Sequence, residues 1–136
     1  MARSAVVGRI KQNILVEGRE CWTLFDTGSL NNYVVEDFAS LGIVAPLAEP
    51  RTTGLGDAVR RVEKRCMLSC RIQNRMLDVY ALVLPEIGPD ESDKRIEFLF
   101  GALEMQRWGI VPVPQEERID MSHYPEMWVE YQEAIS

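Results

Sequence analysis

Phe25-Asp26-Thr27-Gly28-Ser29 is the stretch of sequence that decides how this chain folds. Residues 21–25 form an apolar, β-rich run, so we expect a strand to deliver the Asp26 carboxylate into a tight turn. Gly28 permits backbone angles and a close approach that a residue with a Cβ would resist. Thr27 is small and can hydrogen-bond locally, and Ser29 places a hydroxyl within reach of the same carboxylate. The stretch predicts a carboxylate held in a shaped turn at the end of a strand.

The tripeptide Asp-Thr-Gly by itself also allows a simpler interpretation, a solvated aspartate in a surface β-turn. The apolar flanks on both sides, 21–25 and 30–34, favour a functional turn, because a solvated turn does not need them. A second segment supports this interpretation. Phe98-Leu99-Phe100-Gly101 is followed by residues 102–105, where we expect a short helix.

With these two segments the chain resembles the aspartic proteases, and its length of 136 residues points to the retropepsin-like branch. In that family the apolar-Gly segment and its helix pack behind the catalytic loop. Residues 108–113 and 117–120 resemble the closing strands, so the likeness covers roughly residues 5–121. It implies an all-β fold, a closed β-barrel or sandwich with one short helix after Leu99-Phe100-Gly101.

The pattern of apolar residues along the chain agrees with an all-β fold, because short strands follow one another with few helices. Two prolines exclude a central strand at 45–50, which is expected to be a loop or an irregular strand. Short helices are expected at 35–41 and 101–107, and an exposed loop at 85–94. The expected strands are 4–10, 13–16, 21–25, 59–69, 76–84, 96–100, 110–113 and 118–121.

Residues 52–58 predict a β-hairpin whose tip is rich in glycine, since Gly54 and Gly56 flank Leu55. The resemblance implies that this tip is the flap, which closes over an extended peptide, excludes water and supplies backbone hydrogen bonds. Glycines at a hairpin tip need no function, so the plainer interpretation stays open.

Peptide hydrolysis by carboxylates needs two of them. One is ionised and takes a proton from water, and the other is protonated and donates a hydrogen bond to the carbonyl oxygen. This chain has a single Asp-Thr-Gly, because Asp57 and Asp90 have the wrong neighbours. The resemblance supplies the second carboxylate through a C₂ homodimer, in which Asp26 of one copy faces Asp26 of the other.

Site roles follow from the same resemblance. Asp26 is expected to be the catalytic aspartate, Thr27 to brace the two loops across the dyad, and Gly28 to let the substrate approach. The residues expected to bind the peptide or protein substrate are Ser29, Gly54, Leu55 and Gly56.

Two residues depart from the family pattern. Ser29 stands where an alanine is common, and Ala102 stands where a polar residue often contacts the other protomer. An active aspartic endopeptidase is therefore one hypothesis, and a non-catalytic module that uses the fold for dimerisation or peptide binding is the other. The intact Asp26 favours the enzyme, because like charges at a two-fold axis cost energy unless they share a proton.

Composition excludes several other classes of protein. The chain is 46% apolar, which is enough for a real core in a single domain. Its net charge of −6 argues against a general nucleic-acid binder, which needs a basic surface. No apolar run is long enough for a membrane-spanning helix, and the start lacks a long apolar signal region. We expect a cytoplasmic protein, or a segment of a larger chain, with no membrane partner.

Neither a metal nor another cofactor is expected. His123 is the single histidine, and the three cysteines do not have the spacing of zinc ligands. Cys66 and Cys70 lie too far apart along one strand for a disulfide. Together with Cys21 they are expected to be buried free thiols in a reducing compartment.

The chain is expected to divide into a retropepsin-like domain at residues 1–121 and an amphipathic tail at 122–136. In the tail, Tyr124, Trp128, Tyr131 and Ile135 recur at helical spacing, and Pro125 suits a first helical turn. Such a helix packs either on its own domain or against a second copy or another partner. Packing on its own domain is favoured, because a terminal amphipathic helix usually docks there.

Overall fold

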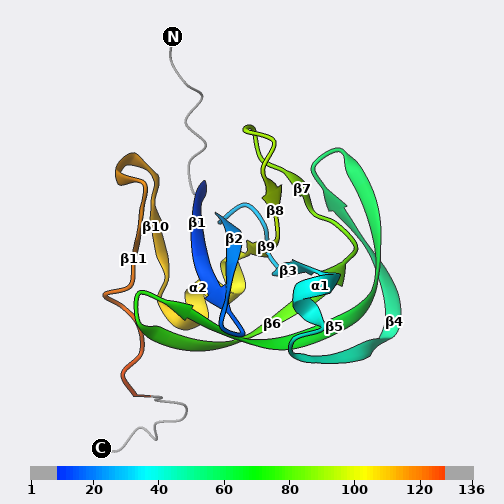
Figure 1. Ribbon diagram of the computed structural model, residues 1–136, viewed down its shortest axis with the longest axis horizontal. Helices are drawn as coiled ribbons and strands as arrows, with labels where there is room; N and C mark the ends of the chain where they lie inside the picture. The colour runs from blue at the N-terminus through cyan, green and yellow to red at the C-terminus, as the bar shows by residue number, and fades with distance from the viewer. Residues whose placement is uncertain (1–8, 128–136) are drawn as a thin grey trace, which may run out of the picture.

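The computed structural model describes residues 9–127, and Figure 1 shows the arrangement of its elements. The strands are β1 (Arg9–Val16), β2 (Arg19–Asp26), β3 (Tyr33–Val35), β4 (Ile43–Leu55), β5 (Ala58–Ile72), β6 (Arg75–Leu84), β7 (Gly88–Pro89), β8 (Arg95–Ile96), β9 (Phe98–Phe100), β10 (Val111–Val113) and β11 (Arg118–Asp120). The helices are α1 (Glu36–Ala39), α2 (Ala102–Trp108) and the 3₁₀ turn η1 (Pro114–Glu116). In residues 9–127, no helix has the length and apolar character needed to cross a membrane.

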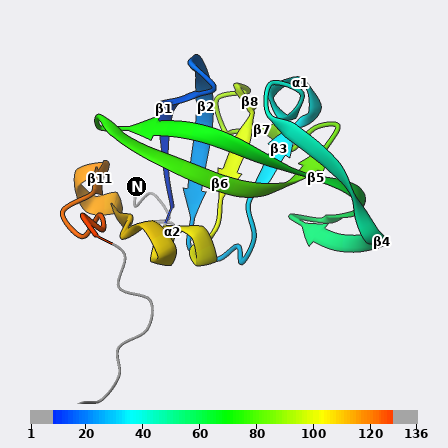
Figure 2. The same ribbon diagram turned by 90° about the horizontal axis from the view of Figure 1, so that it is seen from below.

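The main sheet has seven strands in the order β1-β2-β9-β3-β6-β5-β4. β1 also pairs with β5, through Leu15 opposite Arg71 and Val16 opposite Cys70, which closes the sheet on itself. β4 continues beyond this ring as an outer strand. Figure 2 shows the long strands β5 and β6 passing across the molecule, with α2 beneath them. The expected all-β fold with a closed barrel and a short helix is confirmed.

Strand pairing around Asp26 builds the core. β9 lies parallel to β2 and antiparallel to β3, so it runs between the strand that ends in Asp26 and the strand after the turn. Phe25 pairs with Phe100 across β2 and β9, and their rings stack with centroids 5.2 Å apart. Phe98 lies 5.4 Å from the same Phe100 ring. Because all three rings are fully buried and closely packed, the end of β2 that carries the Asp26 carboxylate is held rigidly.

Several element boundaries differ from the sequence prediction. The two strands expected at 4–10 and 13–16 are, in the described part, the single strand β1, because its ladder with β2 continues through Lys11 and Gln12. The strand expected at 96–100 is interrupted at Glu97, whose side chain accepts a hydrogen bond from the Trp22 N–H at 2.8 Å. The loop at 85–94 contains β7, which pairs with β8. Residues 45–50 belong to β4, with a shift of register between Pro46 and Arg51.

The first part of the tail turns back onto the domain. Tyr124 stacks on Trp108 with ring centroids 5.9 Å apart, and its hydroxyl donates to the Met76 carbonyl at 2.7 Å. No helix begins in residues 122–127, where the Tyr124 N–H instead closes a turn on the Met121 carbonyl at 3.0 Å. The other residues of the predicted stripe, at 128–136, lie outside the described residues.

Candidate functional site

The turn after β2 shapes the Asp26 carboxylate. Asp26 is the last residue of β2, and its carbonyl accepts the Ser29 N–H at 3.1 Å. The Gly28 N–H donates to Asp26 Oδ1 at 2.8 Å. A Cβ at Gly28 would lie 3.1 Å from that same oxygen, so a larger residue would press on the carboxylate. The turn therefore fixes one carboxylate oxygen with a backbone donor.

The second carboxylate oxygen has a charged partner. Arg9 is paired with Asp26 across β1 and β2, and its Nε donates to Asp26 Oδ2 at 3.0 Å. The Asp26 side chain is 13% exposed, so water screens this ion pair less than a pair on an open surface. Sequence reasoning missed this contact, because it depends on the register of two strands and on no local motif.

The Ser29 hydroxyl does not reach Asp26. It donates instead to the Asn31 carbonyl at 3.0 Å, a local contact between residues two apart that short hydroxyl side chains often make. The expectation that the Ser29 hydroxyl hydrogen-bonds the Asp26 carboxylate is therefore wrong. Ser29 braces the turn, and it also lines the cleft described below.

Helix α2 holds the turn from behind, as the apolar-Gly segment predicted. The Ala102 N–H donates to the Ser29 carbonyl at 2.7 Å, and the Leu103 N–H donates to the Leu30 carbonyl at 3.2 Å. Gly101 lies directly against this loop, since a Cβ there would be 2.3 Å from the Asn31 carbonyl oxygen. Backbone hydrogen bonds and close packing from the start of α2 thus hold residues 29–31 in place.

Asn32 is a positioning residue that the sequence analysis did not single out. It is 3% exposed, and its Oδ1 accepts the Gly101 N–H at 2.7 Å. Its Nδ2 donates to the Tyr80 carbonyl at 3.1 Å. One buried amide therefore joins the turn to both β6 and the start of α2. A polar residue placed directly before the apolar strand β3 was the available signal.

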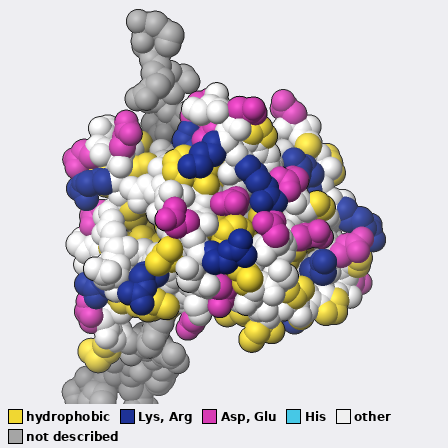
Figure 3. All heavy atoms as spheres, in the orientation of Figure 1, with side chains coloured by type: hydrophobic (Ala, Val, Ile, Leu, Met, Phe, Trp, Pro, Cys, Tyr) yellow, Lys and Arg dark blue, Asp and Glu magenta, His cyan; other side chains and the backbone are white. Residues whose placement is uncertain are grey.

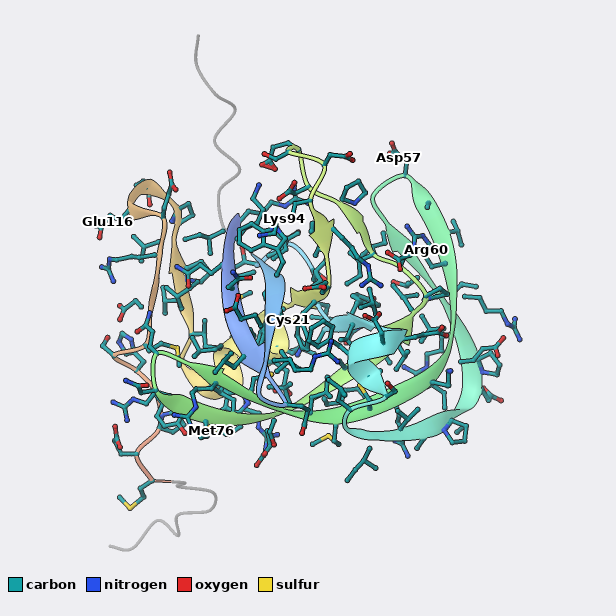
Figure 4. All side chains as sticks on the ribbon, in the orientation of Figure 1. Cys21, Asp57, Arg60, Met76, Lys94 and Glu116 are labelled. Atoms are coloured by element: carbon teal, nitrogen blue, oxygen red, sulfur yellow. The ribbon has the colours of Figure 1, made fainter. Side chains whose placement is uncertain are left out.

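The β4–β5 hairpin covers the turn, and two of its side-chain hydrogen-bond attachments to the body lie at one level. The Tyr33 hydroxyl lies 2.7 Å from Thr53 Oγ1 on β4. On β5, Arg60 donates to the Glu86 carbonyl at 2.6 Å. Thr53 and Arg60 are direct register partners, so both attachments lie in one rung. Figure 4 shows Arg60 on this hairpin and Asp57 at its tip.

A cleft of about 550 Å³ lies between the turn and the hairpin tip. Of the predicted site residues, those that line it are Asp26, Gly28, Ser29, Gly54, Leu55 and Gly56. Thr27 is exposed beside them. Most of the remaining wall is apolar, and its large members are Leu24, Leu30, Tyr33, Ile87, Ile96 and Leu99. The structure thus brings the two sequence-distant segments to one cleft.

Arg95 stabilises the wall of the cleft from outside. Its guanidinium pairs with Asp37 at 2.9 Å and with Glu86 at 2.6 Å, which joins α1, β8 and the segment before β7. These hydrogen bonds lower the pKa of Asp37 and of Glu86 below their ordinary values. Arg60 of β5 donates to the carbonyls of Glu86 and Ile87. The ion pairs of Arg95 therefore also support the segment to which the hairpin is attached.

The structure gives no sign of metal-binding chemistry in its described part. Across residues 9–127, no group of three or more His, Cys, Asp and Glu side chains is arranged to hold an ion. The three cysteines are free and buried, as predicted. Burial raises the pKa of Cys21 and of Cys66 to about 12, so both are poor nucleophiles at neutral pH. Figure 3 shows acidic and basic side chains interspersed on one face.

Comparison with known proteins identifies the fold. No protein-family model matches the chain, and no curated protein sequence matches it. The retroviral protease-like domain of Ddi1 from Leishmania major has a TM-score of 0.62 at 12% identity, over 85% of this chain and 90% of that chain. EIAV protease complexed with the inhibitor HBY-793 has a TM-score of 0.50 at 17% identity, over 79% of this chain and 95% of that chain. Likeness at these identities shows the fold, which is retropepsin-like.

Proposed function

We propose that this chain, which has the retropepsin-like fold, is an aspartic endopeptidase whose catalytic dyad forms from Asp26 of two copies. The observation that carries the proposal is the placement of Asp26: a carboxylate with a fixed oxygen lies in a cleft beneath a glycine-tipped hairpin. Within the lining of that cleft Asp26 is the single carboxylate, so one copy of the chain cannot supply the pair that the reaction needs.

The dyad would work through a shared proton. Two carboxylates about 3 Å apart do not both ionise, because their charges repel. The ionised Asp26 takes a proton from water, and the resulting nucleophile attacks the peptide carbonyl. The protonated Asp26 donates to the carbonyl oxygen. The first carboxylate then passes the proton that it took from water to the amide nitrogen, and the C–N bond breaks to release the amine. Arg9 occupies one lone pair of Asp26 Oδ2. Because a carboxylate offers about four acceptor sites, Asp26 still has free lone pairs to accept the proton from water.

The other residues of the site have supporting roles in this proposal. A substrate peptide lies extended between the turn and the hairpin, where it pairs as an added strand. Gly54 and Gly56 leave their backbone groups uncovered by side chains, and Leu55 contacts the substrate. Thr27 braces the two turns across the two-fold axis, which agrees with its exposure in a single protomer.

A non-catalytic module for dimerisation or peptide binding is the second candidate. The Arg9–Asp26 ion pair favours it, because Arg9 compensates the charge of Asp26 within one protomer. The charge is then tolerated in a fold that performs no hydrolysis. A peptide-library hydrolysis assay from about pH 4 to about pH 8, with and without a statine-type inhibitor, separates the two candidates, because only a working dyad gives inhibitor-sensitive cleavage.

The decisive experiment combines Asp26→Asn with dilution. Asp26→Asn should abolish hydrolysis and leave the fold intact, since the amide is nearly isosteric. Asp78→Asn, on an exposed position of β6, is the matched control and should keep full activity. The specific activity of the wild type should fall on dilution, over the same concentrations at which sedimentation shows the dimer dissociating into monomers. Full turnover by Asp26→Asn, or constant specific activity in a monomer, would contradict the proposal.

A further inference from the structure

Arg9 presents unused hydrogen-bond donors in the cleft. Its Nε is taken by Asp26 Oδ2 at 3.0 Å. Among residues 9–127 this is the one hydrogen bond that the Arg9 side chain makes, and the side chain is 48% exposed. A guanidinium carries five N–H donors in a planar fork. The edge formed by Nη1 and Nη2 is therefore available to a ligand while Nε stays on Asp26.

The charge in the cleft leaves room for an anion. Arg9 and Asp26 are its charged lining residues, and the others are apolar or neutral. On the proposed function, two copies bring two Arg9 side chains, whereas a dyad that shares one proton carries a single negative charge. The assembled cleft then holds a surplus of one positive charge, from two cations and one anion. An incoming carboxylate would neutralise that surplus.

We propose that Arg9 is a specificity-determining residue that selects peptides carrying a carboxylate next to the scissile segment. The carboxylate binds the Nη1–Nη2 edge in a bidentate manner, the geometry that guanidinium and carboxylate groups prefer. It lies on the side of the guanidinium away from Asp26, so the two anions are separated by the cation. The rest of the bound segment is apolar, to match Leu24, Leu30 and Leu99. This inference rests on the proposed function for its charge count.

The test uses a fluorogenic peptide library with an apolar core, in which Glu replaces Gln at one position at a time. Free and amidated C-termini form a second arm, which separates a side-chain carboxylate from a terminal one. In the wild type, one position should favour the carboxylate by about tenfold in kcat/KM, through KM. Arg9→Gln should lose that preference, Arg9→Lys should retain part of it, and Arg9→Glu should favour Lys at the same position.

Arg71→Gln is the matched control, because Arg71 is exposed on β5 and does not line the cleft. It should keep the wild-type preference. Sedimentation of each variant shows whether it still assembles, and Arg9→Lys keeps the test valid if Arg9→Gln does not. Equal Glu-to-Gln ratios in wild type and Arg9→Gln at every position would overturn the inference.

A binding arm separates this inference from the proposed hydrolysis. The same labelled peptides are measured by fluorescence anisotropy at concentrations where the protein assembles. Binding with an Arg9-dependent carboxylate preference but no cleavage supports the inference and contradicts the protease. Cleavage without any carboxylate preference supports the protease and overturns the inference. Peptides that neither bind nor react contradict both.

Discussion

The turn that carries Asp26 and the hairpin that covers it are both built around glycines, but for opposite reasons. Gly101, at the start of α2, packs against the loop after Asp26, and a Cβ there would lie 2.3 Å from the Asn31 carbonyl oxygen, so this contact has no space for a side chain. A Cβ at Gly54 or Gly56 would have no atom within 4 Å, so the space beside both tip glycines is open. Close packing positions the carboxylate, whereas the open tip leaves room for a substrate.

Replacement of Gly101 should produce the largest effect. Gly101→Ala forces the Asn31 carbonyl to move, and we expect it to lower the free energy of unfolding by about 3 kcal/mol, in the range for overpacked sites. Gly54→Ala meets no atom and should change it by less than about 0.5 kcal/mol. Urea denaturation of both variants measures the difference. Similar stabilities for the two would mean that the turn is not closely packed.

Asn32 tests the polar attachment of the same turn. Asn32→Ala leaves the Gly101 N–H and the Tyr80 carbonyl without their buried partner, which should cost about 2 kcal/mol. Because the turn then shifts, the rate of hydrolysis should fall by more than the loss of folded protein alone accounts for. Asn13→Ala, at an exposed position of β1, is the control and should be neutral. An Asn32→Ala protein with wild-type unfolding would remove Asn32 from the positioning role.

Tyr33 tests the attachment of the hairpin. Tyr33→Phe removes the 2.7 Å contact with Thr53 and should cost about 1 kcal/mol. Its main effect should be faster amide exchange in the hairpin and a higher KM, with the turn unchanged. Tyr80→Phe, at a residue that is 39% exposed, serves as the control. Unaltered exchange in Tyr33→Phe would show that the Tyr33–Thr53 contact does not hold the hairpin in place.

The smallest effect concerns pH and the Arg95 network. Asp37 and Glu86 have pKa values lowered from 3.8 and 4.5, so their stabilisation is present above those values and is lost as pH falls through the lowered ones. The unfolding free energy of Arg95→Gln should therefore approach that of wild type in acid. At neutral pH the difference should be on the order of 1 kcal/mol, since the carboxylates are mostly exposed. A constant difference from about pH 6 to about pH 3 would contradict this assignment.

Local signals in the sequence were sufficient for much of this architecture. Three elements could be predicted because each depends on residues that are close in sequence. They are the Asp-Thr-Gly turn, the glycine-tipped hairpin and the helix after Gly101. Arg9 opposite Asp26 depends on a strand register over 17 positions, and Asn32 depends on its distant partners Gly101 and Tyr80. The break at Glu97 likewise follows from a contact with Trp22, far away in the chain.

The outer strand β4 has a consequence for solubility. Within residues 9–127, every other strand of the seven-stranded sheet has a ladder partner on two sides, whereas β4 pairs with β5 alone. A free strand edge is a template for further strands, and thus for aggregation. Pro46 and Pro50 lie on this edge and lack the N–H that an added strand would need, and the register of β4 shifts between Pro46 and Arg51. The same prolines that interrupt the strand pattern in the sequence therefore make the outer edge of β4 a poorer template for an added strand.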